Sequence, residues 1–266
     1  MKTVKLSQAA GLQLLLAIDI GNTNIKLGLF CGGSLIKFSI ALADSHLFGE
    51  GLGELIRQNA AAEKITAAMV SSVVPLLTGQ ICSALRPYLT GELHIVSHRT
   101  NTGLSYSLHH PERLGADRLV AAAWAYHHFG APSAVIDFGT ATTISVTGHS
   151  GVFIGGAIIP GLRTMARAFS EHTAALPLVE LAMPLSALGK DTREAIISGI
   201  VYGTAGAVSR IIYEIEMEIG YNLKIAITGG NMPLIVPCLE RVDVAEPDLL
   251  LKGLKQIYER MRQAWM

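Results

Sequence analysis

Short apolar runs alternate with longer amphipathic stretches along the whole chain. Residues 14–20 form a continuous apolar run of strand length, which predicts a strand covered on both faces. Residues 24–31 and 34–42 predict two more strands, and the intervening Gly32-Gly33 pair is typical of a hairpin turn. The chain therefore begins with a predicted three-stranded meander.

Helical and strand patterns then alternate. We predict a helix over 44–62, a strand over 65–72, a helix over 76–89 and a short strand over 93–96. Residues 100–110 look irregular. Pro111 and Glu112 are suited to open a helix that runs to about residue 129.

The same pattern restarts at residue 133. An apolar strand over 133–137 again ends in Asp and is followed by strands over 142–147 and 152–159. The later elements are predicted helices over 161–174, 192–220 and 248–263 and a strand over 224–228. An internal duplication is the simplest explanation, although short apolar strings ending in Asp-x-Gly also arise by coincidence.

Composition narrows the class of protein. The 266 residues carry 21 Lys and Arg against 21 Asp and Glu, so the net charge gives no footprint for nucleic acid or for an anionic membrane surface. No uninterrupted apolar stretch approaches the roughly 20 residues that cross a bilayer. Three isolated cysteines fit a reducing compartment, so we expect a cytoplasmic protein.

Both restarts place Asp at the end of a buried strand with Gly two residues later, at Asp19 to Gly21 and at Asp137 to Gly139. Glycine lets phosphate oxygens approach the backbone N–H groups, and neighbouring hydroxyls can donate further hydrogen bonds. One such turn is also an ordinary tight turn. Two in register, from opposed halves, indicate a phosphate clamp.

Five motifs resemble the type III pantothenate kinase family in sequence and order: Asp19-Ile-Gly-Asn-Thr23, Gly115-Ala-Asp-Arg118, Asp137-Phe-Gly-Thr-Ala-Thr-Thr143, Gly155-Gly-Ala-Ile-Ile-Pro-Gly161 and Gly189-Lys-Asp-Thr192. The resemblance implies an α/β, duplicated ribonuclease H-like (actin-like ATPase) fold. It would have two similar halves, residues 1–115 and 116–266, with mixed five-stranded sheets flanked by helices.

The resemblance also implies a nucleotide site between these halves. Asp137 would bind a monovalent cation, K⁺ or NH₄⁺, and Mg²⁺ would accompany ATP. The residues implied in ATP binding are Asp19, Ile20, Gly21, Asn22, Thr23, Asn24, Ile25, Lys26, Thr140, Gly229 and Gly230. After Gly229 and Gly230, which resemble the adenosine turn of the superfold, the chain has Asn231-Met232 where the family commonly has Leu-Ala.

In the family resemblance, Asp117 is the catalytic base that accepts the proton of the pantothenate hydroxyl. Gly115, Ala116 and Arg118 would hold the substrate beside it. From its position alone, Asp117 is equally an ordinary acidic residue in the first turn of a helix. We expect the helix dipole to lower its pKa and keep it ionised.

Two further substrate contacts are implied with less support. Thr192 resembles a pantothenate-binding threonine, and the position also suits a helix N-cap. The family usually places a substrate-binding Tyr where this chain has Leu108, and Tyr106 shares its face in an extended segment. Either Tyr106 reaches the substrate or the pocket lacks that hydroxyl.

The sequence thus predicts an ATP-dependent kinase that converts pantothenate into 4′-phosphopantothenate, the first step of coenzyme A biosynthesis, and the resemblance implies a homodimer. Two alternatives remain at this point. One is a non-catalytic regulatory relative that binds a nucleotide or a partner, and the other is a different small-alcohol kinase of the same superfold.

Overall fold

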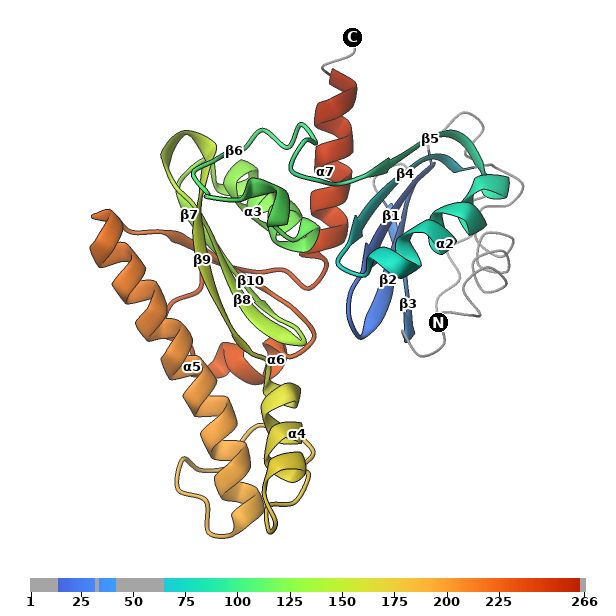
Figure 1. Cartoon of the computed structure of the whole chain (residues 1–266). Helices are drawn as coiled ribbons and strands as arrows, with labels where there is room; N and C mark the ends of the chain where they lie inside the picture. The colour runs from blue at the N-terminus through green and yellow to red at the C-terminus, as the bar shows by residue number, and fades with distance from the viewer. Residues whose placement is uncertain (1–13, 32–33, 42–64, 264–266) are drawn as a thin grey trace. The chain divides into compact units, whose positions relative to one another are not determined.

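The computed structural model describes residues 14–31, 34–41 and 65–263 (Figure 1). The chain divides into two compact units. Unit 1 contains the chain up to residue 102, residues 112–120 and the segment from residue 250, and unit 2 contains residues 103–111 and 121–249. This division differs from a single cut after residue 115, because the C-terminal helix returns to unit 1. The helix predicted over 44–62 and the turn at Gly32-Gly33 lie outside the described residues.

The sheet of unit 1 is built around one central strand. Its described strands follow the order β3-β2-β1-β4-β5. Strands β1, β2 and β3 pair antiparallel, whereas β4 and β5 run parallel to β1. The bounds are β1 Leu14–Ile20, β2 Asn24–Cys31, β3 Ser34–Ala41, β4 Ile65–Ser72 and β5 Leu89–Ile95.

Strand β1 is buried along its whole length, as its continuous apolar sequence predicts. On one face, Leu16 and Ile18 share a hydrophobic core with Ile81 of α2 (Pro75–Leu85), which covers that side of the sheet (Figure 1). On the other face, Leu251 of α7 (Leu249–Gln263) lies against Gly28 of β2. Helices on both faces leave only the ends of β1 open to a ligand.

The sheet of unit 2 repeats this plan and confirms the predicted duplication. Its described strands follow the order β11-β10-β7-β8-β9-β6, so β9-β8-β7-β10-β11 matches β3-β2-β1-β4-β5 in order and direction. The sixth strand, β6, comes from the segment predicted to be irregular. The bounds are β6 Ser105–Tyr106, β7 Ser133–Phe138, β8 Ala141–Thr147, β9 Val152–Pro160, β10 Lys224–Thr228 and β11 Val244–Ala245.

Four further helices help to position the candidate site. They are α3 (Ala116–Phe129), α4 (Leu162–His172), α5 (Thr192–Ile219) and the short α6 (Met232–Ile235). A separate 3₁₀ turn over Pro111–Arg113 precedes α3, so this helix begins later than predicted. Helix α5 ends at Gly220, whose φ of 79° provides the left-handed C-cap. Figure 1 shows α3 and α5 on opposite sides of the unit 2 sheet.

Helix α5 is the one described helix whose length and composition would suffice to cross a membrane. Its most apolar window has a mean hydropathy of 1.5, and 44% of that window is buried inside the protein. Ile196, Ile200 and Val208 pack into the core of unit 2 against Ile136 of β7. A buried core helix satisfies the same length and composition criteria, so the packing of α5 in the core of unit 2 explains its apolar sequence.

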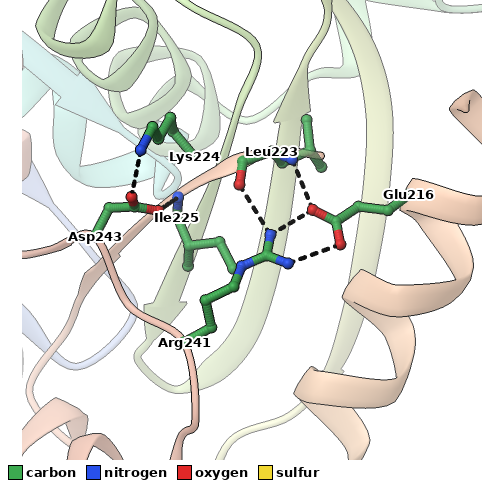
Figure 2. Close-up of polar contacts among 6 residues, drawn as sticks. All are labelled: Glu216, Leu223, Lys224, Ile225, Arg241 and Asp243. Atoms are coloured by element: carbon green, nitrogen blue, oxygen red, sulfur yellow. Dashed lines mark hydrogen bonds and ion pairs between the residues drawn. The ribbon is translucent and has the colours of Figure 1, made fainter. Parts of the chain in front are cut away.

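A polar network ties the C-terminal turn of α5 to the start of β10 (Figure 2). Arg241 donates a 3.0 Å hydrogen bond to Glu216 and a 2.9 Å bond to the carbonyl of Leu223, whose N–H donates to Glu216 at 2.6 Å. Asp243 accepts from Lys224 Nζ and from the backbone N–H of Ile225, both at 2.8 Å. These contacts fix the strand that leads into the Gly229-Gly230 turn.

The pKa of Glu216 is lowered overall. Burial raises it, but the hydrogen bonds from Arg241 and from the Leu223 N–H, together with the charge of Arg241, outweigh this effect. A carboxylate with a depressed pKa stabilises the fold above its unfolded-state pKa and loses this contribution as the pH falls through the folded-state value.

We therefore expect Arg241→Ala to lower the free energy of unfolding at pH 7 by about 1–3 kcal/mol, because it leaves a partly buried carboxylate without its cation. Urea unfolding should show this loss shrinking as the pH is lowered below about 4. The matched control is Arg210→Ala, which breaks an exposed pair with Glu214 and should cost no more than about 0.5 kcal/mol. Equal losses for the two variants would contradict the network's role.

Candidate active site

The first candidate phosphate loop is the turn between β1 and β2. We call residues 20–24 the first turn. The N–H of Gly21 donates a 3.0 Å hydrogen bond to the carbonyl of Asn24, which closes the turn. Asn22, Thr23 and Asn24 are exposed, whereas Ile20 and Ile25 are fully buried and can contact a ligand only through their backbone.

Asp19 lies beside a serine on the neighbouring parallel strand. It pairs with Ser71 of β4 and with Lys26 of β2, and it is only 6% exposed. Ser71 is fully buried, and its hydroxyl has no hydrogen-bond partner among the described residues. The end of β1 thus places a buried carboxylate and a buried hydroxyl side by side.

Unit 1 also brings Asp117 close to the end of β1. The N–H of Val73 donates a 3.1 Å hydrogen bond to the carbonyl of Ile20. A Cβ on Gly115 would lie 3.8 Å from the Val73 side chain and 2.5 Å from Asp117 Oδ1. Only glycine at position 115 therefore leaves room for the Asp117 carboxylate in this position, which gives the Gly-Ala-Asp-Arg motif a steric reason.

The structure contradicts the expectation that the helix dipole lowers the pKa of Asp117. Burial raises its pKa, and this effect exceeds the lowering by the Arg118 N–H, which donates to Asp117 Oδ1 at 2.7 Å, and by the Arg118 charge. The sequence showed the helix start but not the desolvation. A carboxylate with a raised pKa is a better proton acceptor.

The second candidate phosphate loop has the same design in unit 2. We call residues 138–141 the second turn. The N–H of Gly139 donates a 3.1 Å hydrogen bond to the carbonyl of Ala141, as Gly21 does to Asn24 in the first turn. Asp137 pairs with Thr228 on the parallel strand β10. This pairing corresponds to that of Asp19 with Ser71 in unit 1.

The carbonyl of Thr140 in the second turn is held by α4. It accepts hydrogen bonds from the N–H of Gly161 at 3.1 Å and from the hydroxyl of Thr164 at 2.7 Å. A Cβ on Gly161 would collide with the carbonyl oxygens of Gly139 and Thr140, so the start of α4 can approach this closely only with glycine there.

The Gly-Gly turn, residues 228–231, packs against the end of β7 and the second turn. Gly229 adopts a φ of 100°, and a Cβ there would collide with Asp137 and with the backbone of Phe138. Asn231 is 8% exposed and bonds to the carbonyls of Phe138 and Gly139. The sequence marked Asn231 only as a departure from the family pattern, and nothing in its local context indicated these contacts.

The structure places the other predicted substrate residues in α5 and β6 of unit 2. Thr192 is exposed at the first position of α5, but Asp191 is the N-cap, and its Oδ1 accepts the N–H of Glu194 at 2.8 Å. Tyr106 lies in β6 opposite Phe153. Tyr106 and Leu108 are both partly buried between exposed neighbours, as expected for one face of an extended segment.

The two strand-end carboxylates suit hard cations. Mg²⁺ is usually held by one or two carboxylates together with substrate phosphates and water. Among the described residues, no group of three or more His, Cys, Asp or Glu side chains could form a protein-only metal cage. Asp19 in unit 1 and Asp137 in unit 2 each offer one carboxylate beside a turn suited to phosphate, and each fits a cation that also contacts phosphate and water.

Duplicated mixed sheets, each with a carboxylate and a glycine turn after the central strand, place the chain in the actin-like ATPase fold class. Solved structures with this fold include ethanolamine utilization protein EutJ from Carboxydothermus hydrogenoformans, with a TM-score of 0.54 at 15% identity over 94% of this chain and 91% of that chain. A glucokinase from an Antarctic psychrotroph gives a TM-score of 0.51 at 10% identity, covering 93% of this chain and 99% of that chain.

Within this class, the chain belongs to the type III pantothenate kinase family, whose sequence profile matches residues 15–214. The type III pantothenate kinase of Agathobacter rectalis is 38% identical over 257 residues, which cover 94% of this chain and 98% of that protein. The relative from Thermomicrobium roseum is also 38% identical, over 94% of this chain and 99% of its own length.

The raised pKa of Asp117 yields a stability prediction. An acid whose pKa is higher in the folded state opposes folding once it is ionised, and this effect disappears below the unfolded-state pKa of about 3.9. Asp117→Asn keeps an oxygen for the Arg118 N–H and removes the charge. We expect this variant to unfold at a higher temperature than the wild type at pH 8 and at the same temperature below about pH 4.

The matched control is Glu171→Gln, which removes one negative charge from an exposed position on α4. It should change the free energy of unfolding by less than about 0.5 kcal/mol. If Asp117→Asn is no more stable than the wild type at pH 8, the carboxylate is not desolvated.

Proposed function

We propose that this chain catalyses the ATP-dependent phosphorylation of pantothenate to 4′-phosphopantothenate, the first step of coenzyme A biosynthesis. The family membership supports the reaction. The observation in the structure that carries it is the partly buried Asp117 carboxylate, which lies against Gly115 close to Val73, the residue whose N–H donates to the carbonyl of Ile20 at the end of β1.

In this proposal, the chain contributes positioning and electrostatics rather than covalent chemistry. Asp117 accepts a hydrogen bond from the primary hydroxyl of pantothenate and takes its proton as that oxygen attacks the γ-phosphorus. The bond between the γ-phosphorus and the β–γ bridging oxygen breaks, and ADP leaves with that oxygen. The raised pKa suits this role, since a solvated aspartate would bind a proton more weakly.

Backbone N–H groups and hydroxyls of the two turns bind the phosphates of ATP. Residues 19–26, Thr140, Gly229 and Gly230 form the proposed nucleotide-binding set. Ile20 and Ile25 contribute only backbone, because their side chains belong to the core. Mg²⁺ and a monovalent cation, K⁺ or NH₄⁺, would be held beside Asp19 and Asp137 and would neutralise phosphate charge when bound.

Gly115, Ala116, Asp117 and Arg118 form the proposed acceptor site, where the Arg118 guanidinium pairs with the pantothenate carboxylate. Thr192 and Tyr106 are proposed as further contacts. Thr192 is exposed at the start of α5, as a ligand contact requires. We further propose a cytoplasmic homodimer that binds neither nucleic acid nor membrane. The balanced charge of the chain supports the last two points.

The direct experiment measures ADP release from ATP with pantothenate as acceptor, in Mg²⁺ with and without K⁺. We expect turnover with pantothenate and a strong increase on adding K⁺. Absence of turnover despite nucleotide binding would favour a regulatory relative. Turnover with glucose or acetate alone would assign the chain to another kinase of the superfold.

Asp117→Asn should reduce kcat by about 10²- to 10⁴-fold, the range typical for loss of a positioned acid or base. The KM for ATP should change little, because Asp117 is not in the proposed nucleotide-binding set. The wild-type kcat/KM should fall at acid pH with an apparent pKa above the ordinary aspartate value of about 3.9. Full activity in Asp117→Asn would remove this residue from the reaction.

A further inference from the structure

Asn231 connects two segments that the proposed function assigns to nucleotide binding. Its backbone N–H donates to the carbonyl of Phe138 at 3.0 Å. Its side-chain amide donates to the carbonyls of Phe138 and of Gly139, each at 3.2 Å. One residue of the Gly-Gly turn therefore holds two consecutive carbonyls of the second turn.

These contacts determine the orientation of the turn's peptide groups. In a planar trans peptide the C=O of one residue and the N–H of the next point in opposite directions. Fixing the Gly139 carbonyl toward Asn231 consequently directs the N–H of Thr140 away from Asn231. The Thr140 carbonyl on the next peptide is fixed independently by Gly161 and Thr164.

The surroundings make Asn231 hard to replace by another donor. It is only 8% exposed, and its side-chain bond to the carbonyl of Phe138 is buried, whereas the bond to the carbonyl of Gly139 is partly buried. Gly229, two residues earlier, packs so closely on Asp137 and Phe138 that an added Cβ would collide with both. Loss of the amide would leave the Gly139 carbonyl without this buried donor, and the peptide could then rotate.

We propose that Asn231 is a positioning residue for the nucleotide: its side-chain amide holds the second turn in the peptide orientation that binds the phosphates of ATP. This inference rests on the proposed function for its choice of ligand. Asn231 acts through the Gly139-Thr140 peptide and does not itself contact the reacting atoms.

Two variants test this role. Asn231→Leu removes the amide and keeps a side chain of similar size, and Asn231→Asp keeps the shape but replaces the N–H donor by an oxygen that faces two carbonyls. Both retain the backbone hydrogen bond to Phe138. We expect each to weaken the binding of ADP, measured calorimetrically in Mg²⁺ and K⁺, by about 10-fold, as the loss of one or two neutral hydrogen bonds implies.

The kinetic pattern separates positioning from general destabilisation. The KM for ATP should rise about as much as ADP binding weakens, while the KM for pantothenate should stay within about twofold. The control is Ile212→Val, a buried substitution in α5 that lowers the unfolding temperature through lost packing and should leave ADP binding unchanged.

Unchanged ADP binding in folded Asn231 variants would overturn the inference, as would failure of both variants to fold, since Asn231 would then be needed for folding itself. The proposed function is tested by a different result from the one that tests Asn231. A wild type that binds ADP without phosphorylating pantothenate refutes the function, yet the variants still test Asn231. A wild type that binds no ADP refutes both.

Discussion

Each half of this fold depends on one constraint, the burial of its central strand along all or nearly all of its length. Strands β1 and β7 lie inside their sheets, with antiparallel and parallel neighbours on either side. Their apolar side chains leave no place for polar chemistry along the strand, so it concentrates where the strand ends. There, a carboxylate, a hydroxyl on the adjacent parallel strand and a glycine turn follow in the same order in both halves.

The ends of β1 and β7 contact different segments in the two units. In unit 1, Val73 donates to the carbonyl of Ile20 at the end of β1, and its side chain lies close to Gly115, which precedes the proposed base Asp117. In unit 2, the end of β7 is held by the Gly-Gly turn and by the start of α4. The duplicated halves thus contain two equivalent turns, and the segments that follow each meander give the turns different neighbours.

Much of this could be predicted from the sequence because it depends on local patterns. The apolar run of β1, the long helix α5 and the repeated Asp-x-Gly are encoded by neighbouring residues. The two-residue strand β6 was missed, because so short a pairing leaves no periodic signal. The pKa of Asp117 and the contacts of Asn231 were missed because both depend on segments distant in the chain.

The central claim is that equivalent strand-end turns in both halves bind the nucleotide phosphates. Amide hydrogen exchange of the wild-type chain, measured with and without ADP and Mg²⁺, tests it directly. The account predicts slowed exchange in residues 20–24, 138–141 and 228–231, with the three-stranded meanders beyond them little changed. Slowed exchange confined to one half, or to other segments, would contradict it.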